Sequence, residues 1–348
     1  MMEIKQDLRS IKYENLVSLI TNLGDKKFRA DQIYGWLHNK QADSFDDMKN
    51  VPGALKEKLS ENYEIFSVCP IEVLESRYDG TKKYLFSLHD GNVIESVFMR
   101  YEHGNSVCVS SQVGCSMGCR FCASTIDGRV RDLTAGEILG QIYSIMKETG
   151  ERISNVVVMG SGEPLDNYDN LIDFIDILTS EKGLNLSQRN ITVSTCGLVD
   201  KIYELAKLKL QITLAISLHA ATDEKRQELM PIARKYSLSD LIKACRHYFD
   251  ETGRRISFEY ALVKGENDSD SDADTLAKLI GSLNCHVNLI PVNPIKERDF
   301  RQSDKSAVQA FRNRLEQNHV TATVRRTLGA DINGACGQLR KAHLDANK

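Results

Sequence analysis

Three cysteines stand close together in the sequence at Cys115, Cys119 and Cys122, separated by three residues and then by two. Thiolates are soft ligands, and in an intracellular chain they usually bind zinc or an iron–sulfur cluster. A structural zinc ion takes four protein ligands, and the nearest histidines, His89 and His103, do not form a tight ligand pair with the triplet. Three thiolates instead suit a 4Fe–4S cluster with one iron open to a substrate or cofactor. Because cysteine is rare, three core cysteines in one loop are the less favoured explanation.

Several polar motifs follow predicted strands. The first, Gly160-Ser161-Gly162-Glu163-Pro164, lacks the Gly-Lys-Ser/Thr of a phosphate loop and, taken alone, is equally well explained as a turn. In parallel α/β folds, binding sites gather beyond the carboxyl ends of the strands. Hydroxyl, imidazole and amide groups there could bind ribose, carboxylate and adenine, although each one singly is more often a cap or turn residue. The further candidates at predicted strand ends are Ser194, Ser217, Leu218, His219 and Asn293.

Two outlying cysteines and one glutamate also carry potential chemistry. Cys108 lies in a predicted strand seven residues before the triplet, where a cysteine is ordinarily a small buried hydrophobe. Cys336 lies between small residues in the polar C-terminal segment, so we expect it to be exposed and reactive. Glu95 lies in a predicted strand, and its pattern alone predicts an exposed carboxylate. The remaining cysteines have no context beyond packing: Cys69, Cys196, Cys245 and Cys285.

The first hundred residues contain two kinds of periodicity. Residues 1–64 predict a helical accessory domain, with helices over 7–23 and 29–40 and a third after Pro52-Gly53. Residues 65–101 alternate with a period of two and predict an antiparallel β-meander. Its strands are expected over 71–78, 81–88 and 92–99, because Asp-Gly pairs separate the three runs.

From residue 102 to about 330 the chain alternates predicted strands and helices, which indicates βα units. Val156-Val157-Val158 is a continuous apolar strand of the kind found in parallel sheets covered by helices. Thr134 and Glu137 have the capping-box spacing and predict the start of a helix that ends at Thr149. Six such units fall short of an eightfold barrel, and the fold class that they indicate is α/β. Residues 331–348 form a C-terminal tail.

The composition is that of an ordinary globular protein. The 348 residues include 41% hydrophobic and 27% charged residues, and no apolar run approaches the roughly 20 residues of a membrane span. The acidic start lacks the cationic and apolar regions of a signal peptide, and nine cysteines, an odd number, suit a reducing compartment. These features predict a cytoplasmic protein. The net charge of −3 gives no global basic field, so any RNA site must be a local patch.

Linked motifs closely resemble the RlmN/Cfr family of radical S-adenosylmethionine (SAM) methyltransferases, which methylate adenosine in large-subunit ribosomal RNA. The CxxxCxxC triplet, with an aromatic residue before its last cysteine, is typical of the radical SAM superfamily. The resemblance to the RlmN/Cfr family extends over nearly the whole chain. The motifs that distinguish this family within the superfamily lie at residues 108–115, 159–164, 217–220 and 335–339. The resemblance implies an open (βα)6 partial barrel that binds a 4Fe–4S cluster and SAM. It assigns the cluster to the triplet and the SAM amino group to Gly162 and Glu163.

The resemblance also implies a mechanism. One SAM methylates Cys336, and a second, bound at the cluster, is split to a 5′-deoxyadenosyl radical that removes hydrogen from the new methyl group. The methylene radical then adds to the electrophilic carbon 2 of adenine, which ordinary methyl transfer from SAM cannot reach. Cys108 releases the product by forming a disulfide with Cys336, and Glu95 is the proton acceptor by motif position. The implied partners are 23S rRNA, also tRNA, and a flavodoxin-like or other low-potential electron donor; we expect a monomer without a membrane contact.

Clusters of arginine flank the proposed site and are candidates for contacts with RNA phosphates, although solvated charge is a fair alternative for each of them. They are Arg129 and Arg131 after the cysteine loop, Arg325-Arg326 at the end of the last strand, and Arg340-Lys341 after Cys336.

Three alternatives remain open from the sequence. Within the family, the Cfr type methylates carbon 8, but Pro164 and Val113 look more like the carbon-2 type, and Gly334 departs from both patterns. A glycyl-radical activase would need the cluster but not Cys336. An iron–sulfur RNA-binding sensor would need neither reaction step.

Overall fold

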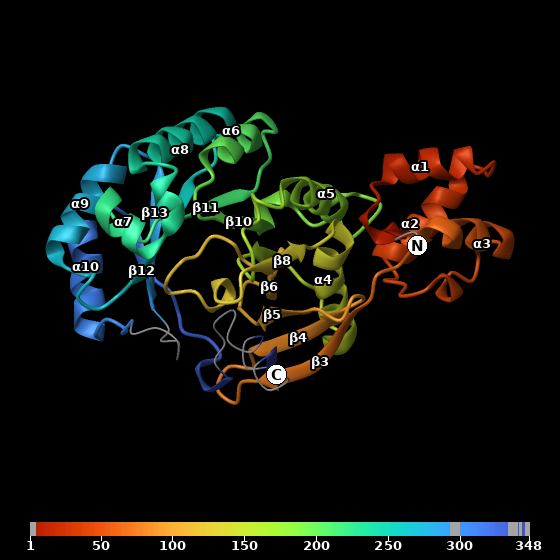
Figure 1. Cartoon of the computed structure of the whole chain (residues 1–348), viewed down its shortest axis with the longest axis horizontal. Coiled ribbons are helices and arrows are strands. Elements are labelled where there is room, and N and C mark those ends of the chain that lie inside the picture. The colour runs from red at the N-terminus through yellow and green to blue at the C-terminus, as the bar shows by residue number, and fades with distance from the viewer. Residues whose placement is uncertain (1–4, 293–299, 333–339, 341–342, 345–348) are drawn as a thin grey trace.

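The structure is a computed structural model that describes residues 5–292, 300–332, 340 and 343–344. Figure 1 shows a helical unit at one end of the molecule and a large α/β body at the other. Asn293 and Cys336 lie outside the described residues. None of the helices in these ranges is long and apolar enough to cross a membrane.

The N-terminal unit contains α1 (Tyr13–Asn22), α2 (Phe28–His38) and α3 (Gly53–Asn62), which pack through buried residues such as Leu16, Ile33 and Leu55. The three predicted helices are therefore present, but the first begins later than expected. The segment before it forms β1 (Gln6–Asp7), which pairs in parallel with β2 (Tyr63–Glu64), and then a short 3-10 helix. The Asp7 side chain caps that 3-10 turn by accepting a hydrogen bond from the Arg9 backbone N–H.

The meander and the parallel strands form one ten-stranded sheet. Its antiparallel part is β3 (Val68–Glu75), β4 (Lys82–Leu88) and β5 (Val93–Met99), and the β3–β4 pairing contains a bulge between Pro70 and Glu72. The next strand, β6 (Ser106–Val109), pairs antiparallel with β5 and parallel with β9 (Asn155–Val158). The sheet then continues in parallel through β10 (Ile191–Thr195), β11 (Thr213–Ser217), β12 (Ile256–Leu262), β13 (Cys285–Pro291) and β14 (Ala322–Val324).

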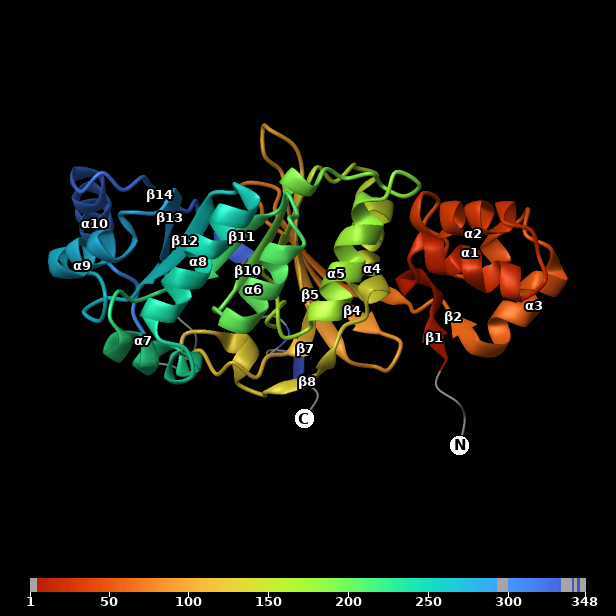
Figure 2. The ribbon, with the colours of Figure 1, turned by 90° about the horizontal axis from the view of Figure 1, so that it is seen from above.

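Helices cover the outer side of the parallel strands (Figures 1 and 2). The predicted helices are present as α4 (Ala135–Thr149), α5 (Tyr168–Thr179), α6 (Val199–Lys207), α8 (Leu238–Thr252), α9 (Asp270–Ile280) and α10 (Lys305–Gln317). The capping box at the start of α4 is confirmed: Glu137 N donates to Thr134 Oγ1 over 3.1 Å, and Thr134 N donates to Glu137 Oε2 over 3.0 Å. The sequence did not predict α7 (Asp223–Leu229), a short helix after β11.

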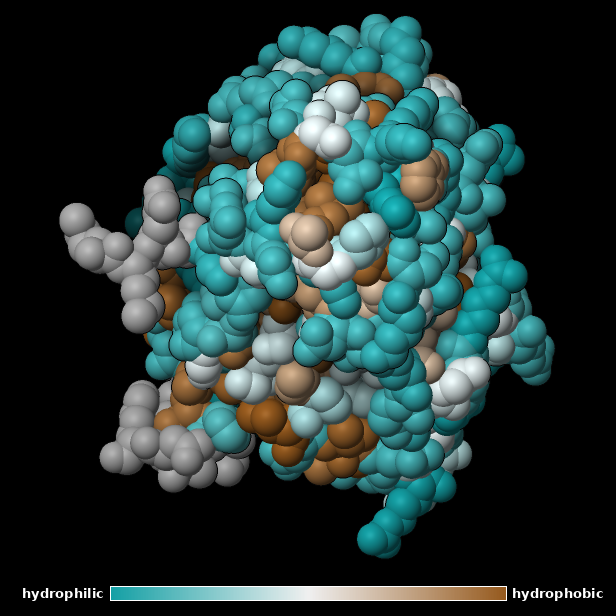
Figure 3. Space-filling view, turned by 90° about the vertical axis from the view of Figure 1, so that its right-hand side faces the viewer, coloured by the Kyte–Doolittle hydropathy of each residue, from teal (hydrophilic) through white to brown (hydrophobic). Residues whose placement is uncertain are grey.

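The N-terminal unit joins the α/β body through buried polar contacts. Arg9 is 2% exposed and donates to the carbonyl oxygens of Ala42 and Phe66 over 2.8 and 3.3 Å. Asp7 accepts a hydrogen bond from Thr134 Oγ1 over 3.0 Å, which ties it to the start of α4. The face seen from this end of the molecule is largely hydrophilic, with scattered apolar patches (Figure 3).

Candidate active site

The cysteine triplet lies in a loop that a small hairpin closes. The hairpin strands are β7 (Gln112–Gly114) and β8 (Arg129–Asp132), and Cys115 N donates to Gly128 O over 3.1 Å where the loop closes. Gly114 has a φ of 77°, and a Cβ built there would lie 1.9 Å from Gly128 O. Only glycine fits this crossing, so residue 114 fixes where the loop begins and ends.

The loop and the carboxyl ends of the strands enclose a cavity of about 330 Å³. Among its lining residues are most of the predicted site residues: Cys108, Cys115, Cys119, Cys122, Gly162, Glu163, Ser194, Ser217 and His219. Leu218 does not line it; this residue is fully buried, and its N–H donates to Glu259 O over 3.0 Å. Glu95 lies on β5 and does not line it either.

The three thiols suit an iron–sulfur cluster. Burial raises the pKa of Cys115 to about 12 and that of Cys119 well above its usual range, and the neighbouring thiolates add to both effects. Burial likewise raises the pKa of Cys122. A cationic iron core supplies the charge that deprotonates such thiols. Within the described ranges no three His, Cys, Asp or Glu side chains surround a single ion position.

The Gly160–Pro164 motif packs its backbone against the segment after β6. A Cβ at Gly162, whose φ is 111°, would lie 2.7 Å from the backbone nitrogen of Gln112, so a larger residue is excluded. Glu163 is 3% exposed, and its two carboxylate oxygens accept hydrogen bonds from Cys196 N over 2.7 Å and Leu165 N over 3.0 Å. Burial raises the pKa of Glu163, whereas these hydrogen bonds act in the opposite direction and lower it. The carboxylate is thus fixed at the cavity wall, where it can accept a hydrogen bond from a cationic amine.

His219 follows β11 with a left-handed backbone, φ 57°. Its Nδ1 accepts a hydrogen bond from Ala261 N over 2.9 Å, which places the ring proton on Nε2. Burial lowers the pKa of His219 to about 3, so the ring is neutral near pH 7. The ring packs edge-on against Phe121 of the cysteine loop, with centroids 4.8 Å apart. The strand ends therefore present a neutral imidazole beside the hydroxyls of Ser194 and Ser217, whose oxygens lie 3.4 Å apart.

Cys108 is held rigidly on one side of the cavity. It pairs with Val97 of β5 and with Val157 of β9, and its side chain is 7% exposed. Burial raises its pKa to about 11. All eight cysteines within the described part of the chain are free thiols.

The prediction that Glu95 is exposed is wrong. Glu95 is 1% exposed because β5 is an interior strand, and Lys83 Nζ lies 3.5 Å from its Oε2. The backbone N–H of Arg340 donates to its Oε1, so the C-terminal segment covers this carboxylate. Asp331, on the other side of Cys336 in the sequence, accepts hydrogen bonds from Ser76 Oγ over 2.7 Å and Arg77 N over 2.9 Å. Described residues on both sides of Cys336 thus contact the meander.

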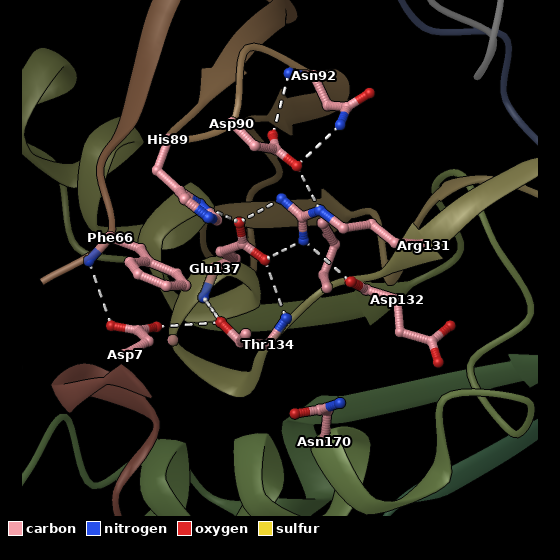
Figure 4. Close-up of polar contacts among 12 residues, drawn as sticks. Asp7, Phe66, His89, Asp90, Asn92, Arg131, Asp132, Thr134, Glu137 and Asn170 are labelled. Atoms are coloured by element: carbon pink, nitrogen blue, oxygen red, sulfur yellow. Dashed lines mark hydrogen bonds and ion pairs between the residues drawn. The ribbon is translucent and has the colours of Figure 1, made fainter. Parts of the chain in front are cut away.

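Several arginines predicted to meet RNA are engaged within the protein. Arg131 forms an ion pair with the fully buried Glu137 at 2.8 Å and with Asp90 at 2.6 Å (Figure 4). Arg340 is 5% exposed, and its Nε donates to Val93 O. Arg129 pairs with Asp166 and Asp132. The cavity lining instead includes Arg325 and Arg326, which are both exposed.

The sequence patterns did not identify two buried charged residues near the cavity. Glu259 lines it and accepts hydrogen bonds from Ser257 Oγ over 3.0 Å and Asn288 Nδ2 over 2.7 Å. The signal that could have identified Glu259 is a glutamate inside a mostly apolar predicted strand. The second is Arg226 on α7, which is fully buried. Its heptapeptide DEKRQEL has the composition of a solvent-exposed segment, so no local signal marks it.

The fold and site define a class of protein. The family model described as "Radical SAM superfamily" matches residues 109–277, and that described as "Ribosomal RNA large subunit methyltransferase N-terminal domain" matches residues 6–65. A radical SAM methyltransferase from Sphaerobacter thermophilus superposes with a TM-score of 0.91 at 41% identity, covering 96% of this chain and 98% of that one. The protein is a radical SAM enzyme, and its cofactors are a 4Fe–4S cluster and SAM.

Curated relatives narrow the class. The probable dual-specificity RNA methyltransferase RlmN of Lachnospira eligens is 61% identical over 97% of each chain. Its counterpart from Lachnoclostridium phytofermentans is 53% identical over 98% of this chain and 96% of the relative. The chain belongs to the RlmN family of radical SAM RNA methyltransferases. This confirms the resemblance and the fold class predicted from the sequence, and it disfavours the Cfr type, the activase and the sensor.

Proposed function

We propose that this enzyme methylates carbon 2 of an adenosine in the peptidyl-transferase centre of 23S rRNA, and also an anticodon-loop adenosine of tRNA, through a methylated Cys336. The observation that carries the proposal is the cavity in which the cysteine triplet faces Cys108, in a chain whose relatives of the same length are RNA methyltransferases.

The cavity wall supplies the binding groups. Cys115, Cys119 and Cys122 hold the cluster, which together with SAM supplies a 5′-deoxyadenosyl radical when both are bound. Glu163 accepts the SAM amino group, and Gly162 allows the backbone to approach it. Four further groups, at Ser194, Ser217, His219 and Asn293, orient the rest of SAM, and Leu218 shapes this wall from behind.

Cys108 and Glu95 act after the carbon–carbon bond to adenine has formed and the radical adduct has lost one electron, which the oxidised cluster would accept. Cys108 attacks the Cys336 sulfur, the bond between that sulfur and the methylene carbon breaks, and the carbon takes up a proton as the disulfide forms. Burial keeps Cys108 protonated near neutral pH, so a base must take its proton or that of the adduct. Glu95 is the proposed proton acceptor, and its charge acts on Cys108 by raising the pKa of that thiol.

Three further features belong to the proposal. A flavodoxin-like or other low-potential donor supplies electrons, and an external reductant reduces the Cys108–Cys336 disulfide back to two thiols. The enzyme acts as a monomer in the cytoplasm. Arg325 and Arg326, exposed at the cavity, contact phosphates around the target base.

The test is anaerobic incubation of reconstituted protein with rRNA lacking the modification, SAM and reductant, followed by mass spectrometry of nucleosides. We expect 2-methyladenosine; methylation only at carbon 8 would overturn the assignment. Cys336→Ala should abolish turnover, and Cys108→Ala should accumulate a covalent protein–RNA adduct on a denaturing gel. Cys245→Ala is the matched control, because this thiol is also buried but lies on α8 and does not line the cavity. Full turnover by Cys336→Ala would refute the methylated-cysteine route.

A further inference from the structure

Arg226 joins the ends of two strands that form the cavity wall. Its Nη2 donates to the carbonyl oxygens of Cys196 over 2.6 Å and Ser217 over 3.4 Å, and its Nε donates to that of Leu218 over 3.2 Å. These residues lie where β10 and β11 end. At the ends of the strands these carbonyl groups have no partner on a neighbouring strand of the described structure. The guanidinium group of Arg226 donates hydrogen bonds to them in place of water.

The charge of Arg226 is buried, and the carboxylate of Asp223 acts on it without forming an ion pair. The side chain is 0% exposed, and among the described residues no Asp or Glu oxygen forms an ion pair with it within 4.0 Å. Its Nη1 is buried without a hydrogen-bond partner. Removing a cation from water is costly, and three carbonyl oxygens offset only part of that cost, so an anion bound nearby would stabilise Arg226 in this position.

The helix that carries Arg226 also supports the cysteine loop. Arg226 O accepts a hydrogen bond from Met230 N over 2.7 Å, and Met230 lines the cavity. The adjacent Leu229 O accepts from the backbone N–H of Arg120, inside the triplet, over 2.9 Å. One short helix therefore carries both the side chain that binds the strand ends and a backbone carbonyl that binds the loop of the cysteine triplet.

We propose that Arg226 is the buried counter-charge of the cluster and a positioning residue for the loop that binds it. A doubly positive 4Fe–4S core bound by three thiolates carries one net negative charge, and reduction adds a second. A fixed cation nearby stabilises the reduced form more than the oxidised form, because the attraction grows with the cluster's charge. Arg226 thus favours the reduction that precedes SAM cleavage. The inference rests on the cluster site of the proposed function but not on the RNA substrate.

The test compares Arg226→Gln and Arg226→Lys, each reconstituted anaerobically without SAM or RNA. Redox titration followed by electron paramagnetic resonance measures the midpoint potential of the loaded fraction. We expect Arg226→Gln to shift the potential to more negative values and Arg226→Lys to restore most of the shift. Arg254→Gln is the matched control, because Arg254 donates to Ile212 O and Thr213 Oγ1 at the opposite, amino end of β11.

The thermal midpoint is a second readout, which can be used if a variant binds too little cluster for redox titration. Cluster binding should raise the thermal midpoint of Arg226→Gln less than that of the parent protein, because the buried charge that the cluster compensates is absent. If Arg226→Lys loads iron and Arg226→Gln does not, the need for charge is supported. Equal loading failure by both variants, or a loaded Arg226→Gln with an unchanged potential, would overturn the proposal. Since RNA is absent, neither result depends on which adenine carbon the enzyme methylates.

Discussion

Replacing Glu137 by glutamine should destabilise the junction of three segments, which are α4, β8 and the turn at His89. Glu137 is fully buried, and its oxygens accept hydrogen bonds from Arg131 Nη1 and Nη2, both over 2.8 Å, and from Thr134 N over 3.0 Å. His89 Nδ1 lies 3.1 Å from the same carboxylate (Figure 4). Glutamine keeps the shape but loses the charge, and its amide NH₂ would face one of these donors.

The magnitude follows from burial. Removing one partner of a fully buried ion pair costs about 3–5 kcal/mol. Arg131 is 26% exposed and keeps its ion pair with Asp90 at 2.6 Å, so the variant loses less stability than this range. We expect Glu137→Gln to lower the free energy of unfolding by about 2 kcal/mol, which corresponds to about 3 °C in the thermal midpoint for a chain of 348 residues.

The assay is thermal or urea unfolding of the apoprotein, with Glu151→Gln as control. Glu151 pairs with Arg100 at 2.6 Å, but their side chains are 33% and 37% exposed, and such a surface pair contributes at most about 1 kcal/mol. A double-mutant cycle with Arg131→Gln isolates the pair. The reasoning fails if Glu137→Gln destabilises the protein no more than the control does.

Two further predictions concern backbone geometry and pH. Gly114→Ala should abolish cluster loading, measured as bound iron, because its Cβ would lie 1.9 Å from a backbone oxygen. Gly253 has a φ of 66°, but a Cβ there would meet no atom of the described residues within 4 Å. Gly253→Ala should therefore lower the stability by only about 1 kcal/mol and bind iron normally. Equal iron binding by the two variants would contradict this prediction. Burial lowers the pKa of His38 to about 3, so the unfolded chain takes up a proton near pH 6.5 while the folded chain does not. The contribution of His38 to the free energy of unfolding is therefore retained above about pH 6.5 and is lost as the pH falls toward 3. Between pH 7 and pH 5 the parent protein should lose about 2 kcal/mol of stability that His38→Gln does not lose. His319→Gln is the matched control because that ring is exposed, and an unchanged pH profile of unfolding for His38→Gln would count against the argument.

Local patterns predicted most of the elements, since apolar periodicity and capping residues act within one segment. Thr134 and Glu137 marked the start of α4, and Val156-Val157-Val158 marked a covered parallel strand. Pairings between distant segments left no such signal. The two residues of β1 pair with Tyr63-Glu64, more than fifty positions away, so a helix was the natural prediction there.

Glu95 and Arg226 show the same limit within the site. Alternation along β5 correctly predicted a strand but not that both of its faces are covered, one by α4 and the other by the segment at Arg340. For Arg226, helix α7 is short and polar, and the carbonyls that the side chain satisfies come from two other strands. Burial of charge depends on such contacts, which the local sequence does not contain.

The two ends of the open sheet bear on aggregation. An exposed edge strand offers unpaired N–H and C=O groups on which a second chain can add. Here β3 carries Pro70, which has no N–H to donate, and the bulge before Glu72 breaks the spacing that an incoming strand would need. At the other end β14 is only three residues long. Both ends therefore oppose edge-to-edge addition, which leaves the sheet open without making it a template for fibrils.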